Sequence, residues 1–112
     1  MEKAQNLIAG EWTGNPVVER RNPADPDQVV NTAPASTVSD IDSAVAAASD
    51  AQKAWSAATS VQRGAVLLDA ADLLRQRHTD IAVDLTREEG KTIAEATGEV
   101  RRAIDVLRFF GA

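Results

Sequence analysis

The last 23 residues of the chain, "GKTIAEATGEVRRAIDVLRFFGA" (residues 90–112), give the clearest structural signal. Thr92 is followed three residues later by Glu95, and this spacing is a capping box, in which each side chain bonds the backbone N–H of the other residue. Gly90 stands just before it, and glycine is the usual residue where a helix ends. The stretch therefore predicts one helix that ends at Gly90 and another that starts at Thr92.

The predicted last helix has an apolar face with no cover inside the stretch. The stripe at helical spacing consists of Ala96, Val100, Ala103, Leu107 and Phe110. On the opposite face, Asp105 is spaced for helical ion pairs with Arg101 and Arg108. Burying one Leu or Phe side chain contributes about 1.5–3 kcal/mol. We therefore expect the apolar stripe to need a partner surface.

Three more helices are predicted upstream. Ser39, with Asp42 three residues on, predicts a helix that runs to about Ala58. Its face consists of Ile41, Val45, Ala48, Gln52 and Trp55 and is apolar except at Gln52. A second helix starts near Ser60, after a short hinge, and its stripe consists of Leu67, Ala71, Leu74 and His78, with Leu68 alongside. A third is capped by Thr79 or Asp80, and its inward residues are Ile81 and Leu85.

The first third of the chain reads as strands and turns. Leu7-Ile8 and Glu11-Trp12 flank Ala9-Gly10, the layout of a two-residue hairpin, although the left-handed turn is unfavourable for an alanine. Two valine pairs, at 17–18 and 29–30, then flank the turn-rich "NPADPD" (residues 22–27). The sequence thus predicts an α/β fold with strands and turns in residues 1–37 and about four helices in residues 38–112.

Composition limits the classes of partner. The 112 residues are enough for one small domain, and the formal net charge of −5 makes nucleic acid and membrane surfaces improbable partners. The chain contains no cysteine, and no apolar run is long enough to span a bilayer. No signal-peptide core is visible at the N-terminus, so we expect a cytoplasmic location.

The residues do not assemble into a catalytic site. His78 is the only histidine, and on a helix stripe it is interpreted as a packing residue. Gly90-Lys91-Thr92 matches the end of a phosphate-binding loop, but Leu85 stands where that loop needs its first glycine. The acidic residues Glu88, Glu89, Glu95 and Glu99 and the arginine pairs at 20–21 and 101–102 are interpreted as surface charges. From the residues alone we assign no catalytic, cofactor-binding or metal-ligating residue.

The order of the blocks is more distinctive than any one site. "NLIAGEW" (6–12), "RNPADPDQVV" (21–30), a capped helix ending near a Trp (35–57), "RGAVLLDAADLLRQR" (63–77) and "REEGKTIAEATGEVRRAIDVLRFFGA" (87–112) follow one another. Together they resemble the N-terminal part of the aldehyde dehydrogenase superfamily. The chain departs from the family pattern at Ala9, where Asn is frequent, and at Phe109 and Phe110, where Tyr is common.

The resemblance implies that residues 1–112 are an incomplete N-terminal portion of a Rossmann-like NAD(P)-binding domain. It implies an enzyme that uses NAD or NADP to oxidise an aldehyde to an acid, with its catalytic Cys, Glu and Asn located after this stretch. The "RNPADPDQVV" block is similar to the semialdehyde branch, including enzymes for 2-oxoglutarate semialdehyde. Glu99 matches a position beside which some members bind a monovalent cation, but this is a weak signal, and the favoured interpretation is a surface or salt-bridging Glu.

We accordingly expect the 112-residue chain alone to be inactive and to bind no cofactor. Its expected partner is the remainder of its own enzyme, or a second copy, through Val100, Leu107 and Phe110 of the last helix. Full-length members of the family are homo-oligomers. Two other readings remain open: a non-catalytic binding or assembly module that reuses this piece of the fold, and a helical structural domain with coincidental spacing.

Overall fold

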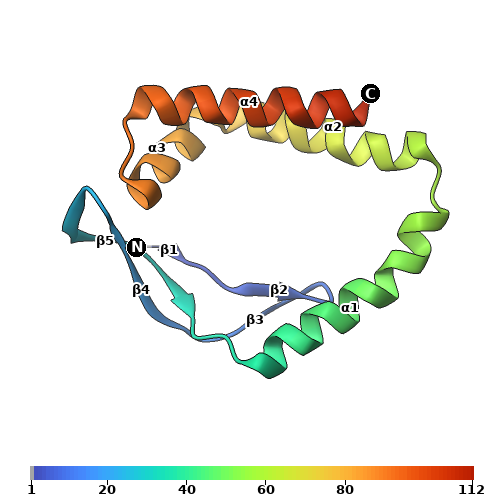
Figure 1. The fold of residues 1–112 in the computed structure, drawn as a ribbon, viewed down its shortest axis with the longest axis horizontal. Helices are drawn as coiled ribbons and strands as arrows, with labels where there is room; N and C mark the ends of the chain where they lie inside the picture. Colours follow the sequence, from blue (N-terminus) through green and yellow to red (C-terminus); the bar gives the residue numbers. More distant parts are fainter. Residues whose placement is uncertain (1) are drawn as a thin grey trace. The chain divides into compact units, whose positions relative to one another are not determined.

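The computed structural model describes residues 2–112, which divide into two compact units at Ala57 and Ala58. The first unit contains the strands β1–β5 and helix α1, and the second contains helices α2–α4 (Figure 1). The predicted fold class, strands followed by four helices, is therefore confirmed. The elements are described unit by unit.

The first hairpin has the predicted register. Strand β2 (Asn6–Ile8) pairs antiparallel with β3 (Glu11–Thr13), and Ile8 lies opposite Glu11. Between them, Ala9 has φ 52° and Gly10 has φ 84°. A two-residue hairpin turn of this hand needs positive φ at both positions, so Ala9 accepts a conformation that L-residues other than Asn and Asp rarely adopt.

The second hairpin has a shorter turn than the sequence predicted. Strand β4 (Pro16–Asn22) pairs antiparallel with β5 (Asp25–Pro34), and only residues 23 and 24 lie between them. The expected turn over residues 22–27 is wrong because the Asn22 side chain accepts the Ala24 N–H at 2.9 Å and closes the turn early. Among residues 2–112, the short strand β1 (Glu2–Lys3) pairs with β5 only at Asn31 and Thr32, and no strand lies beside Pro26 on that side of β5.

Helix α1 (Val38–Ala57) starts earlier than predicted. The reciprocal capping bonds join Thr37 and Asp40: the Thr37 N–H donates to the carboxylate at 2.7 Å, and the Asp40 N–H donates to the hydroxyl at 3.3 Å. The predicted Ser39–Asp42 start is therefore wrong. The same spacing occurs twice in the sequence, and the helix uses the first copy because β5 has already ended at Pro34. No residue of α1 is buried.

The second unit is a bundle of α2 (Ser60–Gln76), α3 (His78–Glu89) and α4 (Ile93–Gly111). Figure 1 shows α4 running alongside α2, with α3 at the end where α4 begins. Its core is made largely of small side chains, which allow close helix packing. The buried residues are Ala71, Ala82, Ala96, Val100 and Ile104, with Leu74, Ile81, Leu85 and Leu107 packed around them. The inward positions predicted for Ile81 and Leu85 are confirmed.

In this second unit, helices begin and end at the predicted residues where a capping side chain or a glycine stop is present. Gly90 ends α3 with φ 73°, and Thr92 and Glu95 form the predicted capping box at the start of α4. A second box that the sequence analysis did not single out, Thr59 with Gln62, opens α2. The cap predicted for α3 at Thr79 or Asp80 is wrong. Only Arg77 separates α2 from α3, and its side chain makes no capping bond.

The buried face of α4 is rotated from the predicted stripe. Val100 and Ile104 are 4% and 6% exposed and Leu107 is half-buried, whereas Ala103 and Phe110 lie on the surface. At about 100° per residue, the true face lies roughly 40° away from the predicted one. The rotation brings Gly111 against α2, where it packs on Gly64. Val100 and Leu107 therefore belong to the core of this unit, and the expectation that they form a free partner surface is wrong.

Candidate functional site

A cluster of charges surrounds Lys91, in the loop between α3 and α4. Its ammonium lies 2.6 Å from the Glu89 carboxylate and 2.5 Å from that of Glu99. The Lys91 side chain is 20% exposed. The hydrogen bonds to Glu89 and Glu99, in that order, raise the pKa of Lys91 above its ordinary value. The cluster joins the end of α3 to the second turn of α4, and Lys91 keeps its charge there.

Glu99 was the only metal candidate that the sequence raised. One oxygen of its carboxylate is engaged by the Lys91 ammonium, so a positive charge is already supplied from within the chain. The role of Glu99 beside a monovalent cation stays a prediction. Among residues 2–112 no group of three or more His, Asp or Glu side chains is arranged to hold a metal ion. His78 is half-buried at the first position of α3.

Gly90, Lys91 and Thr92 do not form a phosphate-binding loop. The α4 N-terminus, where such a loop would offer N–H groups to a phosphate, is covered by the Glu95 carboxylate, which accepts the Thr92 N–H at 3.1 Å. The bond from the Thr92 hydroxyl, followed by the bond from its N–H, holds the pKa of Glu95 below its ordinary value, so the carboxylate stays anionic and repels a phosphate. With Lys91 also paired, these residues do not fit the pyrophosphate of NAD or NADP. The helix-stop and helix-start interpretation of this triplet is confirmed.

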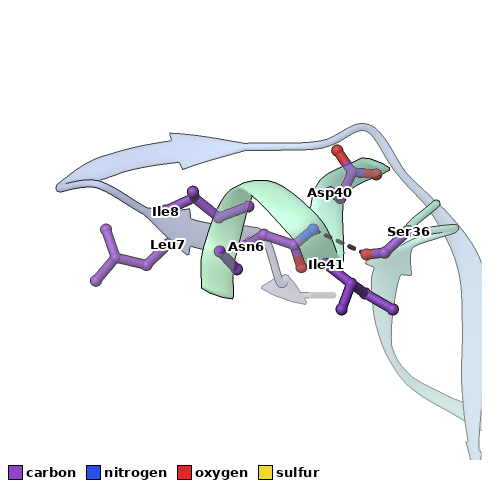
Figure 2. Close-up of a pocket in the computed structure, with 7 residues that line it drawn as sticks. Asn6, Leu7, Ile8, Ser36, Asp40 and Ile41 are labelled. Atoms are coloured by element: carbon purple, nitrogen blue, oxygen red, sulfur yellow. Dashed lines mark hydrogen bonds between the residues drawn. The ribbon is translucent and has the colours of Figure 1, made fainter. Parts of the chain in front are cut away.

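A groove that the sequence analysis did not anticipate lies between β2 and the first turns of α1 (Figure 2). It encloses about 260 Å³ and is lined by Asn6, Leu7, Ile8, Ser36, Asp40, Ile41 and Ala44. The Asn6 amide donates to the Ser36 hydroxyl at 2.8 Å and ties the hairpin to the helix start. No local motif marks this groove, because its two walls are about thirty residues apart in the sequence.

The groove offers little chemistry. Its one carboxylate, Asp40, is held by the backbone N–H and the hydroxyl of Thr37, which lower the pKa of Asp40 below its ordinary value. The other wall atoms are mostly apolar. The lining includes no histidine, lysine or second carboxylate that could act as a base or acid partner. The lining therefore contains no acid–base pair, and the hairpin is tied to the helix start by the Asn6–Ser36 bond.

Several other charged residues make ion pairs that the sequence did not predict. Arg108 pairs with Asp72 of α2 at 3.1 Å instead of with Asp105 of its own helix. Arg21 binds Glu19 at 2.6 Å and the Pro26 carbonyl at 3.0 Å. The Arg108–Asp72 pair joins α4 to α2 and the Arg21–Pro26 bond joins β4 to β5, whereas the Arg21–Glu19 pair lies within β4.

Among residues 2–112, none of the helices is long and apolar enough to cross a membrane.

Comparison with known proteins identifies the class to which this arrangement belongs. The sequence pattern of the aldehyde dehydrogenase family matches residues 12–112. The chain is 42% identical, over 108 residues, to the alpha-ketoglutaric semialdehyde dehydrogenase of Bacillus subtilis (strain 168); the match covers 94% of this chain and 22% of the relative. It is 39% identical over 115 residues to the alpha-ketoglutarate semialdehyde dehydrogenase of Haloferax volcanii, with 99% and 24% covered.

A solved structure agrees with this match. The 1-pyrroline-5-carboxylate dehydrogenase from Thermus, solved with bound NAD, superposes with a TM-score of 0.92 at 31% identity, covering 98% of this chain and 22% of that protein. The chain belongs to the aldehyde dehydrogenase family and corresponds to its N-terminal part. It spans between a fifth and a quarter of the length of the relatives it matches.

Proposed function

We propose that this chain supplies the N-terminal part of an NAD- or NADP-dependent aldehyde dehydrogenase that oxidises a semialdehyde to the corresponding acid. The observation that supports this most directly is the 42% identity to the alpha-ketoglutaric semialdehyde dehydrogenase of Bacillus subtilis across 94% of the chain. The Haloferax volcanii relative carries the same substrate in its name. We therefore propose that the substrate is the semialdehyde of a dicarboxylic acid of the alpha-ketoglutarate type, with one carboxylate and one aldehyde group.

The contribution of residues 1–112 to such an enzyme is structural in this proposal. The loop that most resembles a phosphate site is engaged by Glu95 and by the Lys91 ion pairs, so we assign it no part in holding the cofactor. The bundle α2–α4 and the strand unit would form an incomplete portion of the cofactor-binding domain. A cytoplasmic, homo-oligomeric enzyme is part of the same proposal and is supported by family membership.

A chimera tests the proposed function. In the Bacillus subtilis enzyme, the 108 matched residues would be replaced by this chain, and reduction of NAD and of NADP would be followed with alpha-ketoglutarate semialdehyde as substrate. We expect aldehyde-dependent reduction of at least one cofactor. The control is the same enzyme with the matched residues deleted, which we expect to be inactive. We also expect no turnover from the 112-residue chain alone.

Two results would contradict the proposal. A chimera that folds as well as the parent enzyme but reduces neither cofactor would show that this chain does not support the chemistry. Preference of the active chimera for malonate semialdehyde over alpha-ketoglutarate semialdehyde would contradict the substrate class alone.

A further inference from the structure

The two units of the chain differ in how much of their structure is buried. In the helical unit (α2–α4), all three helices contribute buried residues to one core, and Ile104 is 6% exposed. In the strand unit (β1–β5 with α1), only Val30 and Thr32 of β5 are buried among residues 2–57. The Thr32 hydroxyl has no hydrogen-bond partner among the described residues, and an unsatisfied buried hydroxyl lowers stability. Burial therefore stabilises the helical unit more than the strand unit.

Helix α1 has little cover within the strand unit. Its first turns line the groove beside β2 as far as Ala44, and the Asn6–Ser36 bond lies at the same end (Figure 2). Beyond Ala44 the apolar side chains stay exposed: Val45 is 63% and Trp55 is 42% exposed. An amphipathic helix of a protein owes most of its stability to the packing of its apolar face. The second half of α1 therefore has little to hold it in the helical state.

The helical unit contains its own core and its own helix caps. The capping boxes at Thr59 and Thr92 open α2 and α4, and Gly90 ends α3. Its cluster of buried residues is formed by α2, α3 and α4 alone, with no contribution from residues 2–57. The resistance of a segment to local unfolding follows the apolar contacts that it buries. The helical unit therefore has what it needs to stay folded without the strand unit.

We propose that α2–α4 is a cooperative folding unit of its own, and that the strand unit with α1 opens and closes while the helical unit stays folded. The units divide between Ala57 and Ala58, directly before the Thr59 capping box, so opening of residues 2–57 leaves the bonds between Thr59 and Gln62 in place. Helix α1 is then an order–disorder segment. The inference goes beyond the proposed function and does not depend on it, because it concerns contacts within this chain.

Hydrogen exchange of the whole 112-residue chain, followed by NMR at each amide under native conditions, tests this proposal. After correction for intrinsic rates, we expect the Val45 amide to exchange at least about a hundredfold faster than those of Ala71 and Val100. Two core variants separate the units. Val30→Ala should accelerate exchange of the β5 amides by about fivefold or more and leave Ala71 and Val100 within about twofold. Ile104→Ala should accelerate exchange at Ala71 and Val100 by about tenfold or more and leave Val45 within about twofold.

Three results would overturn the proposal. Equal corrected rates at Val45, Ala71 and Val100 would show that the chain opens as one cooperative unit. Acceleration of Ala71 and Val100 by Val30→Ala, as large as that of the β5 amides, would show that the helical unit depends on the strand unit. Absence of protection at Ala71 and Val100 in the unaltered chain would show that the helical unit does not stay folded. Complete loss of protection in β5 of Val30→Ala, with Ala71 and Val100 unchanged, supports the proposal.

Discussion

The carbonyl oxygen of Gly111 occupies the space that a Cβ atom at position 64 would need. The relationship is reciprocal: a Cβ built on Gly111 would lie 3.0 Å from the Gly64 carbonyl oxygen and 3.0 Å from Leu68 Cγ. The backbones of α2 and α4 are therefore in direct contact at this point. This contact accompanies the observed rotation of α4, in which Val100, Ile104 and Leu107 face the core.

Replacing Gly64 should weaken the bundle. We expect Gly64→Ala to lower the free energy of unfolding by about 1–2 kcal/mol, because overpacking outweighs the helix propensity of alanine. Gly98 is the matched control on α4, since a Cβ there meets nothing within 4 Å. Gly98→Ala should raise the free energy of unfolding by about 0.5–1 kcal/mol. Urea titration measures both, and stabilisation by Gly64→Ala would contradict the close contact.

The rotated face of α4 predicts which of its apolar residues contribute to the free energy of unfolding. Ile104 is buried among Ala71 and Val100, whereas Phe110 is exposed. We expect Ile104→Ala to cost about 2–4 kcal/mol of unfolding free energy because it leaves a cavity. Phe110→Ala should change it by less than about 0.5 kcal/mol. Chemical denaturation of the two variants measures this difference. A larger loss for Phe110→Ala than for Ile104→Ala would favour the apolar stripe expected from the sequence.

The capping box of α4 should contribute measurably. The Thr92 hydroxyl accepts the Glu95 N–H at 3.3 Å, and Thr92→Ala removes that acceptor. We expect a loss of about 1 kcal/mol in unfolding free energy. Thr97→Ala on the same helix is the control, because its hydroxyl bonds only to the Ile93 carbonyl of the preceding turn, and alanine is the better helix former. Equal losses in the two thermal denaturation curves would exclude a specific capping effect.

Acid should weaken the same box. Bonds from the Thr92 hydroxyl and N–H lower the pKa of Glu95 below its ordinary value of 4.5. A lowered folded-state pKa contributes stability that is present above the unfolded-state pKa and is lost as the pH falls through the folded-state pKa. The Tm advantage of the parent chain over Glu95→Gln should therefore shrink as the pH falls below 4.5. A Tm difference that stays constant from neutral pH to pH 3 would contradict this, when both proteins are measured by circular dichroism.

The sequence predicted best where neighbouring residues decide the structure. The Ala9-Gly10 turn, the Gly90 helix stop and the Thr92–Glu95 box each depend on a few adjacent side chains, and each is present. The start of α1 was misplaced because Thr37–Asp40 and Ser39–Asp42 have the same spacing. Choosing between them depends on where β5 ends, which is a property of the sheet.

Features that depend on distant residues could not be predicted. The observed face of α4 includes the close approach of Gly111 to Gly64, and neither glycine contributes to a hydrophobic stripe. The groove at Asn6 and Ser36 joins residues from a hairpin and a helix start. An amphipathic pattern such as that of α1 shows that a face can be covered but does not identify what covers it.

Helices α1, α2 and α4 each begin with a threonine hydroxyl that caps the helix, but the side chain that completes the capping box differs. Thr37 is paired with Asp40, Thr59 with Gln62 and Thr92 with Glu95. Protonation can neutralise the aspartate and the glutamate, but the glutamine amide does not titrate. Because the pKa of Asp40 lies below its ordinary value of 3.8 and that of Glu95 below 4.5, acid stronger than pH 3.8 should fray the first turns of α1 and α4 while the first turn of α2 keeps its bonds. The first turn of α2 thus serves as an internal reference for acid-induced fraying. The measurement compares the hydrogen-exchange rate of the Gln62 amide with the rates of the Asp40 and Glu95 amides.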